Sequence, residues 1–595
     1  MSADSTAASQ SDTHPDNADS SDLSPAKALF RGEIVWSALW PFPGLDSGQK
    51  EMLDMVVDSV EFFLADTQDD FGEWDRIAEQ PKEFFDALRE LGLFGLIIPE
   101  EYGGIGLSNA GYSRVLQQAG RYDSSASLTI GAHSSIGMKG LLLFGTDAQK
   151  KQYLPRLASG EMIAAYCLTE AGAGSDAASI QTKAVRDSNG DWILNGEKIW
   201  ITNGGIADFF TVFARTDGDV GKISAFIVER QFSGVSAGPK ENKLGIRASS
   251  TTTVNFTDVK VPAQNLLGEE GKGFKIAMSI LNNGRTGLGG AAVGGMKTCI
   301  ALAAKHAIER KQFGQSIAEF GLIKKKISEM TVDCFAAESA VWMVTHYIDS
   351  EYSDYSIEAA ISKVFASEAM LRSANEALQI AAGSGYMSDL PYERIFRDSR
   401  ILTIFEGTSE ILRLFIALSG IRDAGQLLQE LGSAVEDIFN DPIKGFGLMS
   451  DYAGRRITNI TSIGQERISG VVAGELRDDA LIFEKYALKL ARMTDSLLRR
   501  HGNAIVDNQF ALQRAADVVI DLFVGLCVLS RVSSMVADDS EQYRQAVSIT
   551  HMFSHQAKRR MNRSLRAMLR NEDEGAKSLA EYIYEVEGYP WDTLA

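Results

Sequence analysis

Cysteine is scarce in this chain. Its 595 residues include four cysteines, and they show neither the paired spacing of a disulfide framework nor the short spacing of a metal site. The sequence therefore predicts a protein of a reducing compartment with no bound metal. Each thiol is best interpreted as a small buried apolar residue. The four are Cys167, Cys299, Cys334 and Cys527.

A membrane-length apolar run and an excess of positive charge are also missing. The most apolar run, residues 518–530, is interrupted by Asp521 and is too short to cross a bilayer. The chain has 59 lysines and arginines against 79 aspartates and glutamates, a net charge of −20. Because such a surface repels polyanions, nucleic acid is excluded as a partner, and a phosphate-bearing ligand would need a local basic site.

Residues 1–24 lack lysine and arginine but contain five aspartates among many serines and alanines. This composition is typical of a disordered acidic tail. The segment has neither the apolar core of a signal peptide nor the arginine-rich, acid-poor composition of a mitochondrial transit peptide. We therefore expect a bacterial cytoplasmic protein, with peripheral contact to the inner membrane left open.

The first half of the remaining chain divides into a helical and a β segment. Residues 25–160 follow a helical pattern. Residues 161–270 have the pattern of strands, and residues 192–201 predict a hairpin that turns at Asn195–Gly196. Further strands are expected at 209–214, 225–228 and 252–256.

The second half is predicted to be helical again. Residues 271–420 contain long segments rich in alanine, leucine and methionine, which are typical of a bundle, and Ser356 is expected to cap one of these helices. Residues 421–475, with a glycine-rich stretch, are predicted to be a linker. Residues 476–595 carry a new amphipathic pattern and predict an additional helical domain. The expected bundle helices include 291–306, 323–346 and 357–381.

One carboxylate near the end of the bundle segment has an unusual setting. Glu406 lies between the apolar run 401–405 and a helix start at Gly407–Ser409. Apolar neighbours raise the pKa of a carboxyl, whereas a helix N-terminus stabilises its charged form. A group balanced between these effects can take a proton from carbon. Taken alone, a glutamate at this place is more often a cap or a solvated charge.

Glu406 does not stand alone, because several motifs occur in a fixed order along the chain. They are YCLTEAGAGSD (166–176), EKIWITNGG (197–205), ERKQFG (309–314) and FEGTSEILRLFIALSG (405–420). Together they resemble the acyl-CoA dehydrogenases, flavoenzymes that oxidise acyl-CoA thioesters to enoyl-CoA. The resemblance covers roughly residues 30–421, and the additional C-terminal segment is similar to the very-long-chain branch of that family.

The resemblance implies both a fold and an activity. The fold is α+β but mainly α, with an N-terminal α-domain, a central β-barrel-like domain, a C-terminal four-helix bundle and the additional helical domain. The activity is FAD-dependent dehydrogenation of a long- or very-long-chain acyl-CoA to trans-2-enoyl-CoA in fatty acid β-oxidation. Electrons would pass to electron-transfer flavoprotein, and the assembly would be a homodimer or larger.

Part of the implied FAD site lies in the β segment. There Gly174 allows close approach of the backbone to a ligand. Ala171 stands where the family commonly has proline, which removes some rigidity from the loop. Trp200 and Thr202 are predicted to share one face of a strand, because side chains alternate with a period of two. The full implied set is Tyr166, Leu168, Thr169, Gly174, Ser175, Trp200 and Thr202.

Another part of the implied FAD site comes from a neighbouring subunit, so that cofactor binding requires at least a dimer. Gly321 stands where shorter-chain relatives often have glutamine, which leaves one adenine-side contact open. Thr408 and Glu410 are also implied as cofactor contacts, although helix capping explains them almost as well. The residues implied to reach the FAD of a neighbour are Arg310, Phe313, Gln379 and Gly383.

On the substrate side, the resemblance implies Glu406 as the base and Ser175, Arg285 and Gly407 as contacts of the acyl-CoA. Some relatives place the base just before this arginine. Here that position is Gly284, which leaves Glu406. The implied reaction is concerted, with Glu406 removing the α-proton while a hydride passes from Cβ to flavin N5.

Two other functions share much of this pattern. An acyl-CoA oxidase would return its electrons to oxygen. One relative of the very-long-chain branch acts in the assembly of respiratory complex I. Retention of Glu406, Thr202 and Arg285 favours an enzyme over a purely structural protein.

Chain length and membrane contact stay open at the level of sequence. Gly131, Ala132 and Gly137 either leave a deep acyl tunnel or serve as close-packing helix contacts. Residues 445–474 mix apolar and basic side chains, which suits an anionic lipid or partner surface. A solvated loop is the alternative.

Overall fold

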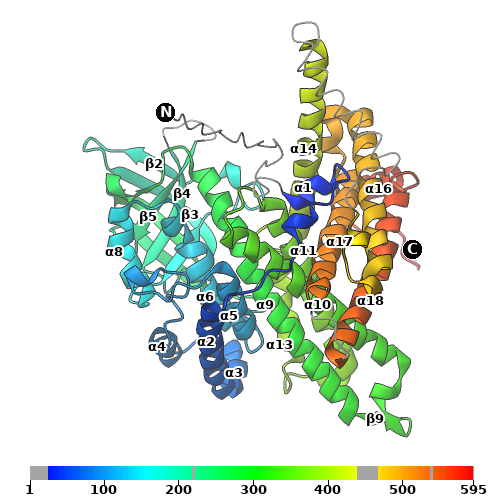
Figure 1. Ribbon diagram of the computed structural model, residues 1–595. Helices are drawn as coiled ribbons and strands as arrows, with labels where there is room; N and C mark the ends of the chain where they lie inside the picture. The colour runs from blue at the N-terminus through cyan, green and yellow to red at the C-terminus, as the bar shows by residue number, and fades with distance from the viewer. Residues whose placement is uncertain (1–23, 217–221, 438–466, 536–539, 594–595) are drawn as a thin grey trace, which may run out of the picture.

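The computed structural model describes residues 24–216, 222–437, 467–535 and 540–593. The chain is mainly helical, and its large sheet lies at one side of the molecule (Figure 1). Most of the expected acidic tail, residues 1–23, and most of the segment expected to contact a membrane, residues 445–466, lie outside the described residues.

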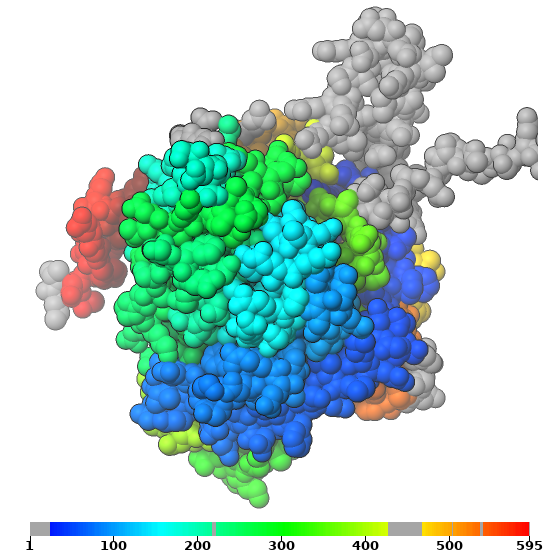
Figure 2. All heavy atoms as spheres, turned by 90° about the vertical axis from the view of Figure 1, so that its left-hand side faces the viewer, coloured from blue at the N-terminus to red at the C-terminus, as the bar shows by residue number. Residues whose placement is uncertain are grey.

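The N-terminal helices pack beside the sheet. Figure 2 shows this side of the molecule, with the blue N-terminal helices below the cyan and green β-domain. Side-chain caps begin several of them, and α8 has a capping box formed by Thr146 and Gln149. A π-helical segment, Ala132–Gly137, follows α6. The helices are α2 (Ser47–Asp66), α3 (Phe71–Ile77), α4 (Lys82–Glu90), α5 (Asn109–Gly120), α6 (Ser124–Gly131), α7 (Lys139–Phe144) and α8 (Asp147–Ala158).

The first described residues pack elsewhere than predicted. Helix α1 (Pro25–Leu29) and the chain up to Pro43 lie against the bundle and the C-terminal helices. Phe30 is buried there, and the indole of Trp342 donates a hydrogen bond to the carbonyl of Pro43 (2.8 Å). The helical pattern of 25–160 therefore belongs to two packing units, which periodicity within each helix does not reveal.

Eight strands form the sheet, in the order β6-β7-β3-β2-β4-β5-β8, with β1 beside β4. β1 and β2 run parallel to β4, and the other pairs are antiparallel. The strands predicted from sequence are confirmed as β4, β5 and β7. The bounds are β1 (Ala164–Cys167), β2 (Lys183–Arg186), β3 (Trp192–Thr202), β4 (Phe209–Thr216), β5 (Ile223–Glu229), β6 (Val235–Lys240), β7 (Thr251–Val261) and β8 (Leu266–Leu267).

The predicted hairpin at Asn195–Gly196 is wrong, because β3 continues through it. Instead of turning, the strand shifts register against β7 at this place. A Cβ on Gly196, whose φ is +155°, would lie 2.4 Å from the Thr182 hydroxyl, so the glycine permits close strand contact. The Asn195 amide exchanges hydrogen bonds of 3.0 and 2.8 Å with Asp258 on β7, which holds the irregularity in place.

The bundle consists of α9 (Gly273–Glu309), α10 (Gly321–Asp349), α11 (Ser356–Ala381) and α14 (Ser409–Asp437), with the shorter α13 (Tyr392–Ser399) beside α11. The three predicted bundle helices are confirmed within α9, α10 and α11. Ser356 does not cap α11. It is the first helical residue, and its N–H donates to the carboxylate of Asp354 (3.2 Å).

Helix α9 is long and apolar enough to cross a membrane by length and composition. No unbroken apolar run marks this helix in the sequence, because residues such as Lys275, Arg285 and Lys297 interrupt it. The most apolar window of α9 is 61% buried inside the protein, where it packs on α5, α10 and α11. The apolar composition of α9 thus matches its place at the centre of the bundle.

The C-terminal helices share one core with the bundle. Helix α17 packs on both α10 and α14, and the apolar run 518–530 is buried along its whole length. Helix α14 also runs past residue 421, where the linker was expected to begin. The additional helices are α16 (Arg477–His501), α17 (Gln509–Ser533), α18 (Glu541–Ala567) and α19 (Asp573–Val586), and Figure 1 shows them against the bundle side away from the sheet.

Candidate active site

A strained turn presents Glu406 to the interior. Glu406 has a φ of +54° and Gly407 a φ of +97°, so two successive residues are left-handed just before α14. This conformation is unfavourable for a glutamate and points to a constraint from its surroundings. Thr408 then caps α14, since its hydroxyl accepts a hydrogen bond from the N–H of Ile411 (3.2 Å). The exposed Glu410 points to no partner in the described chain.

The turn places the Glu406 carboxyl against α9. A Cβ built on Gly284 would lie 3.6 Å from Glu406 Oε2, so the two positions at which the family places its base do face the same space. Oε2 is enclosed and has no hydrogen-bond partner among the described residues. Burial raises the pKa of Glu406, and the charges of Arg285 and then Lys363 oppose that rise.

Arg285 is the second buried group with an unmet hydrogen bond. It is 5% exposed, its Nη1 donates to Asn282 (2.6 Å), and its Nε has no partner in the described part of the chain. Burial lowers the pKa of Arg285 to about 10, and Tyr166 and Glu406 lie in its electrostatic surroundings. Buried polar atoms are nearly always satisfied, so two unmet groups side by side indicate a ligand site.

Lys363 completes this cluster, and sequence reasoning missed it. Its side chain is buried on α11, and its Nζ donates to the carbonyl of Gly407 (2.7 Å). Burial lowers the pKa of Lys363 to about 8, with Glu406 opposing the shift. The available signal in the sequence was a lysine among apolar neighbours, because the protein interior rarely holds an unpaired ammonium. These neighbours, Ile361, Val364 and Phe365, are buried.

A cavity extends from Glu406 along α9. Its volume is about 70 Å³. From Gly284, beside Glu406, to Gly295 at the far end, α9 rises about 16 Å at 1.5 Å per residue. Its walls are mostly apolar and small. They include Gly120, Gly131, Ala132, Gly287, Ala291 and Gly295.

The sequence left open whether Gly131, Ala132 and Gly137 line an acyl tunnel or allow close helix packing, and the structure distinguishes them. Gly131 and Ala132 line the cavity. Gly137 does not line it, and a Cβ there would lie 2.8 Å from atoms of Ala132 and Ala164. Gly137 is therefore a close-packing glycine.

The β-domain part of the predicted FAD site comes together on one surface. The N–H of Ile199 on β3 donates to the carbonyl of Thr169 (2.9 Å), which joins the 169–175 loop to the strand that carries Trp200 and Thr202. Trp200 has a φ of +57° and is 64% exposed, whereas Ile201 is buried. Trp200 and Thr202 thus both point away from the core, although the strand shifts register between Lys198 and Ile201.

A buried ion pair fastens this loop. Lys198 Nζ lies 2.7 Å from Glu170 Oε1, with side-chain exposures of 0% and 8%. Lys198 also donates to the carbonyl of Leu168 (3.0 Å), and Glu170 accepts from Thr182. Both partners lie within the motifs that carry the resemblance, but their pairing across 28 residues is not visible in the sequence.

These residues fit a flat cofactor with a diphosphate. No atom lies within 4 Å of a Cβ built on Gly172 or Gly174, so the loop offers open backbone. Thr169 and Ser175 add hydroxyl donors, and the exposed ring of Trp200 offers an aromatic face beside the hydroxyl of Thr202. Tyr166 and Leu168 lie at the start of the same loop, on and just after β1.

The residues predicted to serve a neighbouring subunit are not brought to this surface. They lie at the turn between β9 (Lys311–Gln312) and β10 (Gln315–Ser316) and around the start of α12 (Gly383–Tyr386). Phe313 is 93% exposed with a φ of +54°. Figure 1 places β9 at the opposite end of the bundle from the sheet. The other three, Arg310, Gln379 and Gly383, are also exposed.

The fold and site define a flavin-dependent dehydrogenase of acyl thioesters. Four family profiles match the chain: "Acyl-CoA dehydrogenase, N-terminal domain" at residues 49–161, "middle domain" at 165–259 and "C-terminal domain" at 271–420, and "ACAD9/ACADV, C-terminal domain" at 474–589. The chain belongs to the acyl-CoA dehydrogenase family.

Individual relatives narrow this assignment. The chain is 44% identical over 547 residues to the human very long-chain specific acyl-CoA dehydrogenase, mitochondrial, covering 89% of this chain and 83% of that protein. An acyl-CoA dehydrogenase from Bacillus anthracis, complexed with FAD, aligns with a TM-score of 0.80 at 31% identity over 95% of this chain and 96% of that one. Butyryl-CoA dehydrogenase from Megasphaera elsdenii aligns with a TM-score of 0.61 at 38% identity over 63% and 99%.

The protein is therefore an FAD-dependent acyl-CoA dehydrogenase of the very-long-chain-like branch, an oxidoreductase that acts on CH–CH bonds.

Proposed function

We propose that Glu406 is the base that takes the α-proton of a long- or very-long-chain acyl-CoA during β-oxidation. The observation that carries this proposal is the enclosed, unpartnered Oε2 of Glu406 at the head of a cavity walled by small residues. The product is the trans-2-enoyl-CoA. Electron-transfer flavoprotein as the acceptor and a bacterial cytoplasmic location remain predictions from the sequence.

The surroundings of Glu406 suit proton abstraction. An apolar cavity removes water from the carboxyl and raises its pKa towards that of a useful base. Arg285 and Lys363 counter that rise and so favour the ionised form, which is the form that accepts a proton. Bound FAD supplies the acceptor for the hydride that leaves Cβ.

The same turn provides a donor for the thioester oxygen. The backbone N–H of Glu406 donates to no carbonyl within the described ranges, so it is available to the substrate. Because Glu406 itself has a left-handed φ, its N–H does not continue the helical hydrogen bonds of the preceding turn. A donor fixed before the reaction stabilises the negative charge that develops on that oxygen. We assign Arg285, Gly407 and Ser175 as further contacts of the acyl-CoA.

For the cofactor, we propose contacts within one chain and contacts from a second copy. Thr408 caps α14, and the contacts of Thr408 and Glu410 with the cofactor stay predictions from the sequence. The within-chain set is Tyr166, Leu168, Thr169, Gly174, Ser175, Trp200 and Thr202, and the set from a second copy is Arg310, Phe313, Gln379 and Gly383. The assembly would then be at least a homodimer.

The test compares wild type with Glu406→Gln in anaerobic mixing with a long-chain acyl-CoA. Wild type is expected to bleach its flavin absorbance. The variant should be slower by at least the 10²–10⁴-fold that removal of a general base typically costs. Glu90→Gln is the matched control, because Glu90 is an exposed glutamate of α4 outside the proposed site, and this variant should bleach normally. Comparable bleaching by Glu406→Gln would refute the proposal.

Two further measurements address the finer predictions. Rates with short, medium, long and very long acyl-CoAs should favour the longer chains. Reduction of electron-transfer flavoprotein should outpace oxygen consumption, whereas the reverse would identify an oxidase.

A further inference from the structure

A second cavity lies behind the far end of the acyl cavity. The two have five lining residues in common, among them Gly295 of α9, Met370 of α11 and Asp398 of α13. The second cavity is not open to Glu406 directly, because Glu406, Phe405 and Ile136 line the first cavity alone. The residues that line both cavities therefore form the wall between them.

Met370 is the movable part of that wall. It is 3% exposed, and its Cε and Sδ lie 2.6 and 2.8 Å from the position of a Cβ on Gly295. The thioether thus lies flat on the backbone of α9, in space that a glycine leaves free. Methionine is unbranched and changes rotamer at little cost, so this contact can close a cavity without being rigid.

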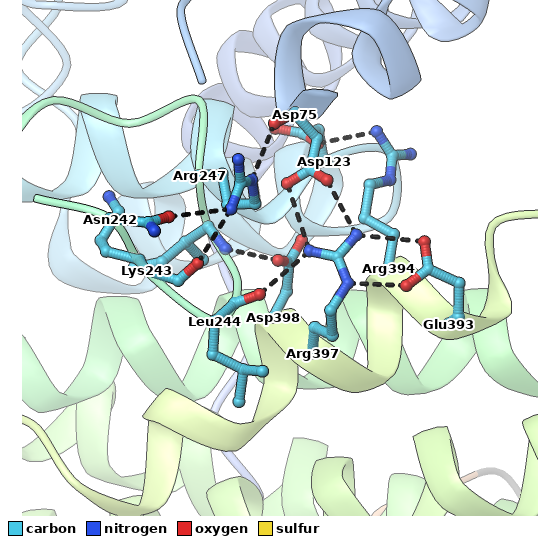
Figure 3. Close-up of polar contacts among 11 residues, drawn as sticks. Asp75, Asp123, Asn242, Lys243, Leu244, Arg247, Glu393, Arg394, Arg397 and Asp398 are labelled. Carbon is cyan, nitrogen blue, oxygen red and sulfur yellow. Dashed lines mark hydrogen bonds and ion pairs between the residues drawn. The ribbon is translucent and has the colours of Figure 1, made fainter. Parts of the chain in front are cut away.

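The remaining wall of the second cavity is polar and fixed. Asp123 and Arg394 form an ion pair there at 3.4 Å, and Asp398 accepts a hydrogen bond from the N–H of Ile246. Figure 3 shows that the neighbouring Arg397 is held in turn by Asp75 and Glu393, so α13 is tied to several elements at once.

This difference in polarity fixes where an acyl chain stops. An apolar chain end gains from the small apolar walls of the first cavity. It would gain less beside the buried Asp123 and its partner Arg394, which offer it no apolar contact. The apolar path therefore ends at Met370, and the acyl chain leaves the second cavity behind it unfilled.

We propose that Met370 determines the upper limit of acyl-chain length by closing the acyl cavity against Gly295. This inference rests on the proposed function, since it takes the cavity beside Glu406 to be the acyl site. Met370 acts on chain length only and does not contact the reacting atoms.

The test measures binding in a background that cannot turn over. Acyl-CoAs of graded length are titrated calorimetrically into the FAD-loaded Glu406→Gln protein and into Glu406→Gln/Met370→Ala. The longest chains should bind about tenfold more tightly relative to medium chains in the double variant, the scale on which a pocket discriminates a methylene group or two. Glu406→Gln/Met370→Phe should change the ratio in the opposite direction.

Met343→Ala in the same background is the matched control, because Met343 is a buried methionine of α10 that lines neither cavity. It should leave the ratio of long to medium chains unchanged. An unchanged ratio in Met370→Ala, or an equal change in Met343→Ala, would overturn the proposal for Met370. Normal flavin bleaching by Glu406→Gln would instead overturn the proposed function, so the two failures are distinguishable.

Discussion

Two regions of the proposed active site differ in how complete they are within one chain. The residues of the substrate side meet one another, whereas those of the outer part of the cofactor site do not meet the flavin loop. On the substrate side, Glu406 of the turn before α14 meets Arg285 of α9 and Lys363 of α11 in the interior. At the other end of the bundle, Arg310 and Phe313 project from the surface without contacting the flavin loop.

This contrast supports the proposal that cofactor binding, but not proton transfer, draws on a second copy of the chain. Proton transfer requires a dry, electrostatically tuned pocket, and the proposed base and its charged neighbours all come from one chain. An aromatic ring that is 93% exposed and held at a left-handed φ is costly for an isolated chain, unless something covers it. The proposed homodimer gives these residues a role that the single chain does not.

Glu406→Gln should separate the two regions most strongly. It is expected to lose at least 10²–10⁴-fold in dehydrogenation while retaining FAD, because glutamine keeps the size and the backbone N–H of the turn. Flavin content after gel filtration and anaerobic stopped-flow absorbance report the two properties independently. Loss of flavin together with activity would mean that the substrate and cofactor sides are not separable.

Lys198→Met should cause the next largest effect, on stability. It leaves Glu170 as an uncompensated buried charge, and breaking a buried pair costs about 3–5 kcal/mol. Urea unfolding of the holoenzyme would measure the loss. Lys82→Met is the control, because Lys82 pairs with Asp86 at side-chain exposures of 82% and 42%, where solvent screening leaves a pair little effect on stability. Equal effects in the two variants would contradict a special role for the pair under the flavin loop.

Arg310→Ala tests the exposed part of the proposed cofactor site. If Arg310 reaches a neighbour's FAD, removing a charged hydrogen bond should weaken FAD binding by roughly 10- to 100-fold, which corresponds to about 1.5–3 kcal/mol. Equilibrium dialysis would give the affinity, and Lys311→Ala, an exposed cation at the next position, is the control. A flavin-replete monomer in analytical ultracentrifugation, or equal affinity in both variants, would sink the shared-pocket proposal.

Lys363→Met should produce the smallest effect, on pH dependence. Removing this cation raises the pKa of Glu406 further, because one of the two charges that oppose burial is gone. The base is active when deprotonated, so the acidic limb of the rate profile should move to higher pH, by about tenfold in rate for each pH unit of displacement. Tyr166 and Tyr112 also face Glu406 and should remain neutral across this range, since burial raises the pKa of each.

Lys363→Arg keeps the charge and should keep the profile close to that of wild type. Lys139→Met controls for the loss of a buried lysine, because the pKa of Lys139 is likewise lowered to about 8 by burial but its partner is Asn109. An acidic limb that stays in place in Lys363→Met would leave Lys363 with a purely structural role.

Much of the fold could be predicted because its signals are local. Short apolar runs give β4 and β5, and helical patterns give α10, α11 and α16; each of these signals fits inside one element. The hairpin prediction failed for the opposite reason. Asn195–Gly196 has the local chemistry of a turn, but close contact with Thr182 and hydrogen bonds to Asp258 keep β3 extended.

The sequence by itself determined the family and the FAD dependence, and it predicted the base at Glu406 rather than at position 284, because these depend on which residue types stand in ordered motifs. The tertiary structure alone decided the surroundings of Glu406. Lys363 meets the Gly407 carbonyl across 44 residues, and Met370 closes the cavity against Gly295 of another helix. The physical reason is that burial and electrostatic partners arise from contacts between elements, whereas periodicity and motif spacing describe each element separately.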